Sequence, residues 1–347
     1  IVGAEVLQAW GWRLPFIFSL ALLAISLWMR LMLRESPVFL AMKKAGTQAK
    51  NPIKEAFTYP GNRRRMLIAM VGIAAGFTVI AYTVMFQALY FLQNGLRVSQ
   101  GIAQLLVGGS AFAGLAAFIF FGWLSDRIGR RKPIIIGYAL VLLLLMPLFQ
   151  FMGSTANPAL SEAAQRAPVV VSGPDCSFDP FAKVQPTACG KLLDQFSKRG
   201  IPYEKQHGPA PAVSIAGQPV SDLSASGIDA GLTHAGYDFG TVTPDWPRAM
   251  ALFGALLLLA TLSGATYGPV AALLSEYFPA RIRYSSLSIP YHLGTGYFGG
   301  FLPFISQYIV ARSGDPFAGL WYPVAIVALA FVVALFARPE TAGRDLE

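Results

Sequence analysis

A cluster of charged residues lies between two apolar runs and has the residue types for ion pairing. Five of the seven residues 126–132 carry a charge: Asp126, Arg127, Arg130, Arg131 and Lys132. The carboxylate of Asp126 can accept hydrogen bonds at the N-terminus of a neighbouring helix, where the helix dipole favours an anion. Gly129 permits a tight turn. The pattern indicates a charged connection between two helices, with basic residues at lipid head groups.

Polar side chains inside the apolar run 66–92 and just after it form a second candidate site. Thr83, Gln87, Tyr90 and Asn94 have the spacing i, i+4, i+7, i+11, which places them on one helical face. Such a face suits a water-filled cavity that binds a small solute, and the neighbouring Tyr82 is included as a candidate. The open alternative is a set of hydrogen bonds between helices, with Tyr90 and Asn94 at the membrane surface.

Three more candidates for the cavity come from later runs: Tyr267, Tyr291 and His292. His292 is the only histidine in a predicted helix, and its imidazole could bind an anion or carry a proton. The alternative is a neutral histidine bonded to an adjacent helix. Tyr267 precedes Gly268 and Pro269, which predict a kink, and it forms either a cavity wall or a packing contact.

Several function classes lack the residues that they need. The predicted helices contain no cluster of His, Cys and carboxylates with metal-ligand spacing, and no phosphate-binding GxxxxGK loop occurs. The sequence therefore indicates neither an enzyme nor a primary pump, and it predicts no cofactor and no metal. The net charge is +9, but no basic stripe alternates with exposed aromatic residues, so no nucleic-acid partner is expected.

The elements that position these residues are membrane helices. Of the 347 residues, 54% are hydrophobic and 13% are charged, whereas soluble domains have about 25% charged residues. Apolar runs long enough to cross a bilayer predict an all-α bundle of seven helices: 14–33, 66–92, 99–121, 133–152, 248–274, 285–310 and 317–337. Because the first residue is Ile1, the sequence is expected to be a piece of a longer protein.

Basic residues are unevenly divided when successive loops are assigned to alternate sides of a membrane. Loops 30–65, 122–132 and 275–284 and the tail from 338 hold 17 Lys and Arg residues, whereas the short loops on the other side hold three. Basic residues in short loops mark the cytoplasmic side. The sequence therefore predicts that these loops and the C-terminus are cytoplasmic, in a multi-pass protein of the plasma (inner) membrane. The long loop 153–247 is then extracytoplasmic (periplasmic).

The loop 153–247 is also the one marked change in composition, because it is rich in Pro and Gly and poor in apolar runs. Both cysteines of the chain, Cys176 and Cys189, lie in it. An oxidising compartment permits a disulfide between them, and two unpaired thiols are the alternative. We expect a partly irregular segment with no catalytic role.

The ordered residues GWLSDRIGRRKP, from Gly122 onward, match the cytoplasmic loop signature of the major facilitator superfamily. Further stretches resemble its metabolite:proton symporter family: GWRLPF at 11–16, RESPVF at 34–39, EYFPARIR at 276–283 and PET at 339–341. The resemblance covers nearly the whole chain except the inserted loop. It implies that residues 1–65 hold the end of helix five, helix six and the central cytoplasmic loop. Residues 66–347 then form the C-terminal six-helix half, interrupted by 153–247.

The resemblance also implies a function and a role for the charged motif. Asp126 and Arg130 are expected to form a charge network with Glu276 that holds one conformational state, with Arg281 nearby. The gating motif then comprises Gly122, Asp126, Arg127, Gly129, Arg130, Arg131, Glu276 and Arg281. The implied function is symport of a small polar metabolite, an organic acid or a zwitterion, with protons, by a monomer in the lipid bilayer. An uncoupled facilitator and a transporter-like receptor remain open alternatives.

Overall fold

The computed structural model describes residues 9–33, 35, 37–179, 182–238, 240–336 and 340–342. The chain forms two compact units, residues 1–50 and 51–347. The first unit contains a short helix η1 and the helices α2 and α3: Gly11–Arg13, Leu14–Met32 and Pro37–Ala45. Helix α2 is apolar over almost its whole length, and its only proline lies in the first turn, where no backbone donor is lost.

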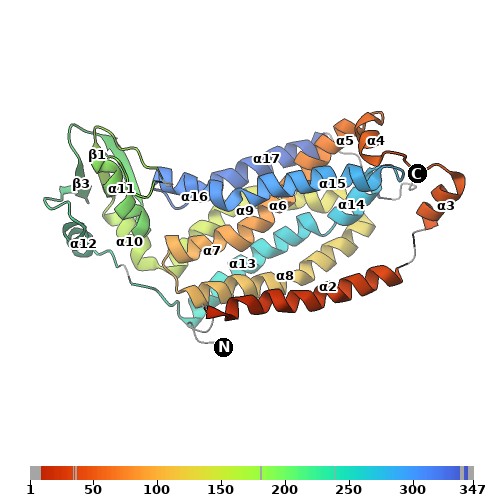
Figure 1. Cartoon of the computed structure of the whole chain (residues 1–347). Coiled ribbons are helices and arrows are strands. Elements are labelled where there is room, and N and C mark those ends of the chain that lie inside the picture. The colour runs from red at the N-terminus through yellow and green to blue at the C-terminus, as the bar shows by residue number, and fades with distance from the viewer. Residues whose placement is uncertain are drawn as a thin grey trace. The chain divides into compact units, whose positions relative to one another are not determined.

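The second unit is a bundle of long helices (Figure 1). Helix α4 (Pro52–Thr58) precedes a continuous helical stretch that alternates α-helical and wider, π-helical turns. Its segments are α5, η2, α6, η3, α7 and η4: Asn62–Ala69, Met70–Ala75, Gly76–Tyr82, Thr83–Gln87, Ala88–Tyr90 and Phe91–Gly95. The other bundle helices are α8, α9, α13, α14, α15, η5, α16, η6 and α17: Gln100–Ile128, Arg131–Ala156, Trp246–Tyr267, Val270–Tyr277, Arg283–Leu293, Gly294–Gly300, Leu302–Ser313, Ala318–Leu320 and Trp321–Phe336.

Within the described part of the chain, six helices are long and apolar enough to cross a membrane. They are Gly11–Met32, Asn62–Gly95, Gln100–Ile128, Arg131–Ala156, Trp246–Tyr277 and Ala318–Phe336. The predicted polytopic helical bundle is therefore confirmed, and each of these helices overlaps one predicted run. The break after Tyr267 lies where Gly268 and Pro269 predict a kink.

The predicted span 285–310 differs from the other six because it is built from consecutive pieces. Its first part is rich in Ser, Tyr and Gly, and the regular helix is interrupted at Phe301, so it does not meet the same test of length and apolar composition. The pieces still run along the bundle (Figure 1): α15 contacts η2, η5 contacts α6, and α16 contacts η3. A polar and interrupted helix is tolerated at membrane depth where protein covers it or where it lines a cavity.

Small residues bring the bundle helices close together. A Cβ atom on Gly264 of α13 would lie 2.8 Å from Ala117 Cβ of α8, and one on Gly268 would lie 2.7 Å from Phe118 O. On the helix 62–95, a Cβ on Gly76 would overlap the ring of Tyr138 in α9. Membrane helices gain their packing energy from such close approach, since lipid supplies no hydrophobic force between them.

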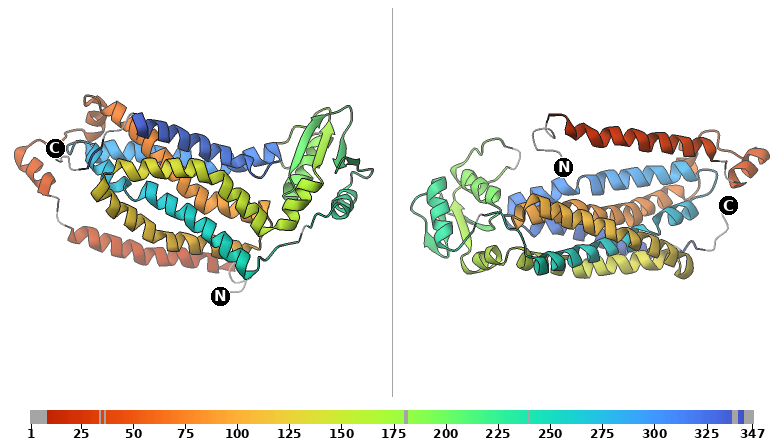
Figure 2. Two further views of the ribbon diagram at one scale, coloured as in Figure 1. Left: turned by 180° about the vertical axis from the view of Figure 1, so that it is seen from behind. Right: turned by 90° about the horizontal axis from the view of Figure 1, so that it is seen from below.

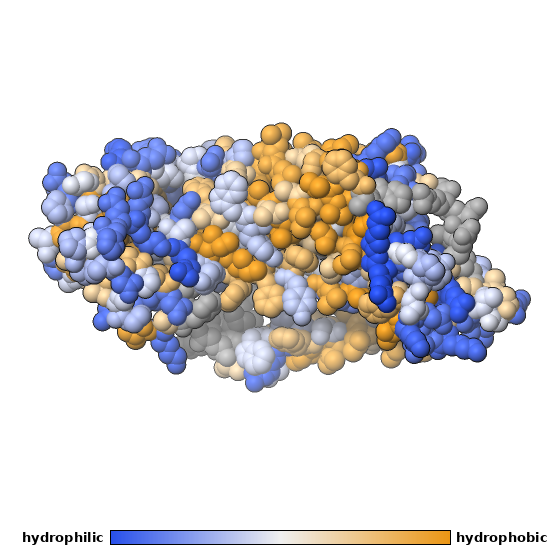
Figure 3. All heavy atoms as spheres, turned by 90° about the horizontal axis from the view of Figure 1, so that it is seen from above, coloured by the Kyte–Doolittle hydropathy of each residue, from blue (hydrophilic) through white to orange (hydrophobic). Residues whose placement is uncertain are grey.

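Apolar and polar side chains separate along the bundle. Figure 3 shows apolar residues gathered over its middle, with polar residues at both ends. One end carries Gly129 and Arg130, between α8 and α9, and is called the Arg130 end. The other end carries the segment 157–245 and is called the insertion end. The band between them has the pattern of a membrane-spanning protein.

The segment between α9 and α13 folds into a small α/β domain at the insertion end (Figures 1 and 2). Its helices α10, α11 and α12 are Pro158–Arg166, Ala188–Arg199 and Ala225–His234. Its strands β1 to β4 are Val169–Gly173, Tyr203–His207, Ala212–Ile215 and Gln218–Pro219. They form a sheet in the order β2-β1-β3-β4, in which β1 is parallel to β2 and antiparallel to β3.

This inserted domain has its own hydrophobic core, which the sequence did not lead us to expect. Val169 and Val171 alternate with more exposed residues along β1, and they pack with Leu193 and Phe196 of α11 and with Leu232 of α12. The expectation of a partly irregular segment therefore underestimated its order. The reason is that short strands acquire a buried face only when distant segments pair with them.

Both ends of the inserted domain are held beside the same stretch of chain. At its start, Asn157 Nδ2 donates to Leu96 O at 3.1 Å. At its end, Val242 N donates to Arg97 O at 2.9 Å, and Val242 O accepts from Ser99 N at 2.9 Å. The domain therefore leaves the bundle and returns to it next to residues 96–99.

A disulfide joins Cys176 and Cys189, whose Cα atoms are 4.9 Å apart. It links the chain after β1 to the first turn of α11. We expect the double substitution Cys176→Ser and Cys189→Ser to lower the free energy of unfolding of the inserted domain by about 3 kcal/mol. The bridged residues are 13 apart in the sequence, and a disulfide that closes a loop of about 15 residues contributes roughly this much. Hydrogen exchange of β1 amides in the full-length protein measures the loss. A reductant should produce a similar loss in the wild type and none in the double variant; equal protection in all samples would contradict the expectation.

Candidate functional site

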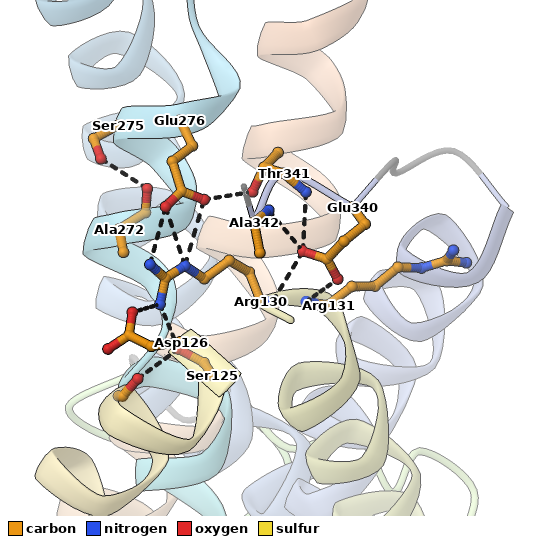
Figure 4. Close-up of polar contacts among 11 residues, drawn as sticks. Ser125, Asp126, Arg130, Arg131, Ala272, Ser275, Glu276, Glu340, Thr341 and Ala342 are labelled. Carbon is orange, nitrogen blue, oxygen red and sulfur yellow. Dashed lines mark hydrogen bonds and ion pairs between the residues drawn. The ribbon is translucent and has the colours of Figure 1, made fainter. Parts of the chain in front are cut away.

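Arg130 lies at the start of α9 and joins three elements at the Arg130 end (Figure 4). Its Nε and Nη2 atoms donate to Glu276 Oε1 of α14 at 3.2 and 3.0 Å. Its Nη1 donates to Ser125 Oγ at 2.9 Å and to a carboxylate oxygen of Asp126. The side chains of Arg130 and Glu276 are 12% and 15% exposed, whereas Asp126 is 61% exposed. The shielded pair is therefore Arg130 with Glu276, and solvent weakens the contribution of Asp126.

Residues 340–342 lie against the same site. The carboxylate of Glu340 accepts hydrogen bonds from Arg130 N at 2.9 Å and Arg131 N at 3.1 Å, the first backbone donors of α9. Thr341 Oγ1 donates to Glu276 Oε2 at 2.8 Å. A carboxylate at this position is stabilised by the helix dipole. We call Asp126, Arg130, Glu276, Glu340 and Thr341 the charge network.

Gly129 is required at the turn for two reasons. Its φ angle of 98° is one that side chains rarely adopt, and a Cβ atom there would lie 2.6 Å from Glu340 Oε2. The carboxylate at the helix N-terminus was expected to be that of Asp126. The structure places Glu340 there instead, because Asp126 is in the last turn of α8 and is directed to the side chain of Arg130.

The electrostatic environment favours the charged forms of Arg130 and Glu340. Burial acts to lower the pKa of Arg130, but the hydrogen bonds and charges of Glu276 and Asp126 outweigh it and raise the pKa above its usual value. For Glu340, burial favours the neutral acid, and the backbone N–H groups of Ala342, Arg131, Arg130 and Thr341 together outweigh it and lower the pKa. Both groups are therefore charged at neutral pH.

The remaining residues of the predicted gating motif lie around the charge network. Arg127 stacks on Trp123, with its guanidinium carbon 4.1 Å from the ring centre. Arg131 Nε donates to Ala334 O at 3.2 Å, near the C-terminus of α17. A Cβ atom on Gly122 would make only an ordinary contact, 3.6 Å from Gly268 O, so space alone does not require glycine there.

Arg281 was expected beside Glu276 but pairs with another residue. Its guanidinium group lies 2.8 Å from Glu55 Oε2 of α4. A second link of this kind is made by the buried Asn62, whose Nδ2 donates to Ser286 Oγ of α15 at 2.9 Å. These contacts attach the chain before the helix 62–95 to the start of α15, next to the charge network but separate from it.

Of the polar residues predicted on one face of the helix 62–95, three line a common cavity. Gln87, Tyr90 and Asn94 border a cavity of about 360 Å³ at the insertion end. Thr83 is not among the lining residues, and its hydroxyl donates to Val79 O of the same helix at 2.7 Å. Tyr82 packs against Phe86, with ring centres 5.2 Å apart. The wider turns of η3 and η4 explain why a single 3.6-residue period did not describe the whole stretch.

Tyr267 and Tyr291 meet at a second place in the bundle. Their hydroxyl groups are 3.1 Å apart, and the ring of Tyr267 stacks on Phe77 with centres 4.4 Å apart. His292 is exposed, and its ring meets that of Tyr291 edge to face. Apart from Tyr82 and Thr83, the predicted cavity residues thus form two groups, one at the insertion end and one between α6, α13 and α15.

Two sets of residues at these sites were not identified from the sequence. Glu340 and Thr341 were noted only as part of a family-like tail, and nothing in their spacing showed that they reach α9. Gln93, which also lines the cavity, lies off the 3.6-residue stripe, and Arg97, which lines it too, lies beyond the end of the helix at Gly95. In the described parts of the chain, no group of three or more His, Cys, Asp or Glu side chains could hold a metal ion.

The lowered pKa of Glu340 predicts how acid affects the tail contact. A depressed pKa means that the contact is fully stabilised above the ordinary glutamate pKa, about 4.3, and is lost as the pH falls through the lower folded-state value. We expect the protection of the Arg131 amide from hydrogen exchange to be constant from neutral pH to about 5 and to fall roughly fivefold in more acidic solution. Glu340→Gln should show the reduced protection at every pH. Equal protection in both proteins would contradict the assignment.

The chain is similar to known transport proteins. The family model described as Major Facilitator Superfamily matches residues 1–170. The chain is 24% identical to the inner membrane metabolite transport protein YhjE of Escherichia coli, over 99% of the chain and 57% of that protein. It is 21% identical to the glycine betaine/proline/ectoine/pipecolic acid transporter OusA of Dickeya dadantii, over 100% of the chain and 52% of that protein.

A third relative is similar over a shorter stretch. The alpha-ketoglutarate permease of Escherichia coli is 26% identical over 44% of the chain and 34% of its own length. The chain spans about half the length of the relatives that match it throughout. No solved structure matches the chain.

Proposed function

The chain belongs to the major facilitator superfamily, and from this premise we propose that the protein is a proton-coupled symporter of a small polar metabolite. The observation that carries the proposal is the charge network, in which Arg130 joins the α8–α9 turn to Glu276 and the tail residue Glu340 binds the start of α9. Such a network can hold a bundle in one state and release it in another, as alternating access requires.

The charge network acts as a latch in this proposal. Its members come from α8, α9, α14 and residues 340–341, so a movement of any one of these elements relative to the others separates charged groups. The shielded pair of Arg130 and Glu276 supplies most of the energy that the movement must overcome. The proposal therefore assigns to these residues a role in the conformational equilibrium and none in solute contact.

The sidedness follows from the distribution of basic residues and is part of the proposal. Loops 30–65, 122–132 and 275–284 and the C-terminus are cytoplasmic, and the Arg130 end faces the cytoplasm. The inserted domain is then extracytoplasmic. The disulfide between Cys176 and Cys189 supports this side, because disulfides persist in oxidising compartments.

The solute class is a small organic acid or zwitterion. Two relatives are named as transporters of glycine betaine and proline and of alpha-ketoglutarate, all of which carry a carboxylate. Gln87, Tyr90 and Asn94 supply neutral hydrogen-bonding groups around a cavity of a size that suits such solutes. His292, Tyr267 and Tyr291 are the further candidates for solute or proton contact.

The test uses the full-length protein in sealed vesicles. Uptake of labelled glycine betaine, proline and alpha-ketoglutarate is measured with and without an inward proton gradient. Accumulation driven by the gradient is the expected result. Equilibration without accumulation would replace symport by facilitated diffusion, and binding without flux would favour a receptor.

A further inference from the structure

A cavity of about 360 Å³ lies where the inserted domain meets the bundle. The helix 62–95 and its exit contribute Gln87, Tyr90, Gln93, Asn94 and Arg97 to its wall, the inserted domain contributes Ser197, Gly200 and Tyr203, and α16 contributes Gln307. Side chains that are remote in sequence, from the bundle and from the inserted domain, therefore face one space. A cavity of this size holds a small metabolite.

Two side chains of the helix 62–95 bring buried polar atoms without partners to this wall. Gln87 is 1% exposed, and its Oε1 atom accepts no hydrogen bond from any residue that the structure describes. The Nε2 atom of Gln93 is likewise buried and, among the same residues, has no acceptor. An unpaired buried polar group costs about 1–3 kcal/mol, so such groups beside a cavity point to a polar ligand that completes their bonds.

The inserted domain is firmly attached at this wall. Tyr203 N donates to Gly314 O at 3.2 Å, and Tyr203 Oη donates to Ala311 O at 3.1 Å. Gly200 approaches so closely that a Cβ atom on it would lie 2.3 Å from Asn94 O. Burial, assisted by the charge of Asp194, raises the pKa of Tyr203 to about 12, so its hydroxyl stays a neutral donor.

The charged and polar residues that line the cavity indicate the chemical class of its ligand. Arg97 is the one charged side chain among the lining residues, and the other polar groups there are amides and hydroxyls. A guanidinium group with neutral donors around it suits a carboxylate, because its planar N–H groups match the two oxygens. No Asp or Glu is among the lining residues, and Asp194, whose charge acts on Tyr203, lies outside the lining.

We propose that this cavity is an outer binding site for a small solute with a carboxylate group, and that the inserted domain completes it. Arg97 binds the carboxylate, Gln87 and Gln93 bind the polar remainder, and Ser197 and Tyr203 close the outer wall. The proposal rests on the proposed transport function only for the choice of solutes. In this proposal the inserted domain takes part in binding the solute.

The test measures binding to the full-length protein in detergent. Hydrogen exchange is followed in residues 94–97 and 197–203 on addition of glycine betaine, proline or alpha-ketoglutarate. Choline is the control for glycine betaine, since it has a hydroxymethyl group in place of the carboxylate. At least one of the three carboxylates should protect both segments, and choline should not.

A variant pair tests the role of Arg97. Arg97→Gln should weaken the binding of the protecting solute at least tenfold. The control Arg166→Gln removes an exposed arginine of the inserted domain, which is paired with Glu162, and should leave the affinity unchanged. No protection by any of the three carboxylates, or unchanged affinity in Arg97→Gln, would overturn the inference even if vesicles show uptake. Protection that depends on Arg97 without any uptake would uphold the site and refute transport.

Discussion

Replacing Glu276 by glutamine is expected to shift the equilibrium between the closed and open forms of the charge network on the order of 10- to 150-fold toward the open form. The reason is that Glu276 accepts three hydrogen bonds from Arg130 at 3.0, 3.2 and 3.4 Å and one from Thr341 at 2.8 Å. Hydrogen bonds to charged groups contribute roughly 1.5–3 kcal/mol. An amide can keep part of this geometry but not the charge.

The measurement combines two properties of the full-length protein. Protection of the Arg131 amide reports the docking of residue 340, and the initial rate of uptake in vesicles reports turnover. Both should fall in Glu276→Gln, with little change in the affinity for solute. Unchanged turnover together with lost protection would mean that the network is structural and does not act as a latch.

Asp126→Asn is the matched control for this variant. It removes one carboxylate charge from the same arginine, but Asp126 is 61% exposed whereas Glu276 is 15% exposed. Exposed pairs contribute about 0.2–1 kcal/mol. The aspartate variant should therefore slow turnover less than about fivefold, and an effect as large as that of Glu276→Gln would contradict the difference in shielding.

Replacing Gly200 by alanine is expected to detach the wall of the inserted domain from the bundle. Gly200 has a φ angle of 67°, and an added Cβ would lie 2.3 Å from the backbone oxygen of Asn94. The left-handed conformation costs alanine about 1–2 kcal/mol, and the overlap adds roughly 1–3 kcal/mol more. The cavity between the domain and the bundle should then lose its shape.

Gly217→Ala separates these two costs. Gly217 has a φ angle of 75° in the same domain, but no atom lies within 4 Å of its added Cβ. Exchange of the Tyr203 amide, which bonds to Gly314 O of the bundle, is compared with that of Val171 within the sheet. Only Gly200→Ala should accelerate exchange of the Tyr203 amide relative to that of the Val171 amide. Equal ratios of the two exchange rates in both variants would show that the contact of Gly200 with Asn94 does not hold the inserted domain to the bundle.

The sequence was informative where local composition decides the structure. Apolar runs defined the spans because lipid leaves a backbone no alternative to a helix. The pairing of Asp126 with Arg130 was implied by the resemblance of the ordered motif to a family signature, and the structure contains this pair. In the run 285–310, polar residues reduce the apolar signal, and the structure accordingly builds it from pieces.

Contacts between distant segments could not be predicted in the same way. Glu340 reaches the start of α9, more than 200 residues earlier in the chain, through packing of the whole bundle. The ion pair of Arg281 with Glu55, 226 residues earlier in the chain, likewise depends on packing of distant segments. The inserted domain shows the limit most clearly, because β1 contains only five residues and its partners β2 and β3 follow a helix that no apolar run indicated.

The attachment of the inserted domain beside residues 96–99 has an evolutionary consequence. Asn157 and Val242 are both bonded to this short stretch, so the chain enters and leaves the domain at almost one point on the bundle. A chain segment between such closely spaced ends can gain residues, lose residues or be replaced without moving the helices on either side. An ancestral connection of a few residues could thus have acquired a folded module in one step, and replacing residues 158–241 by a short linker should return the bundle to that simpler form.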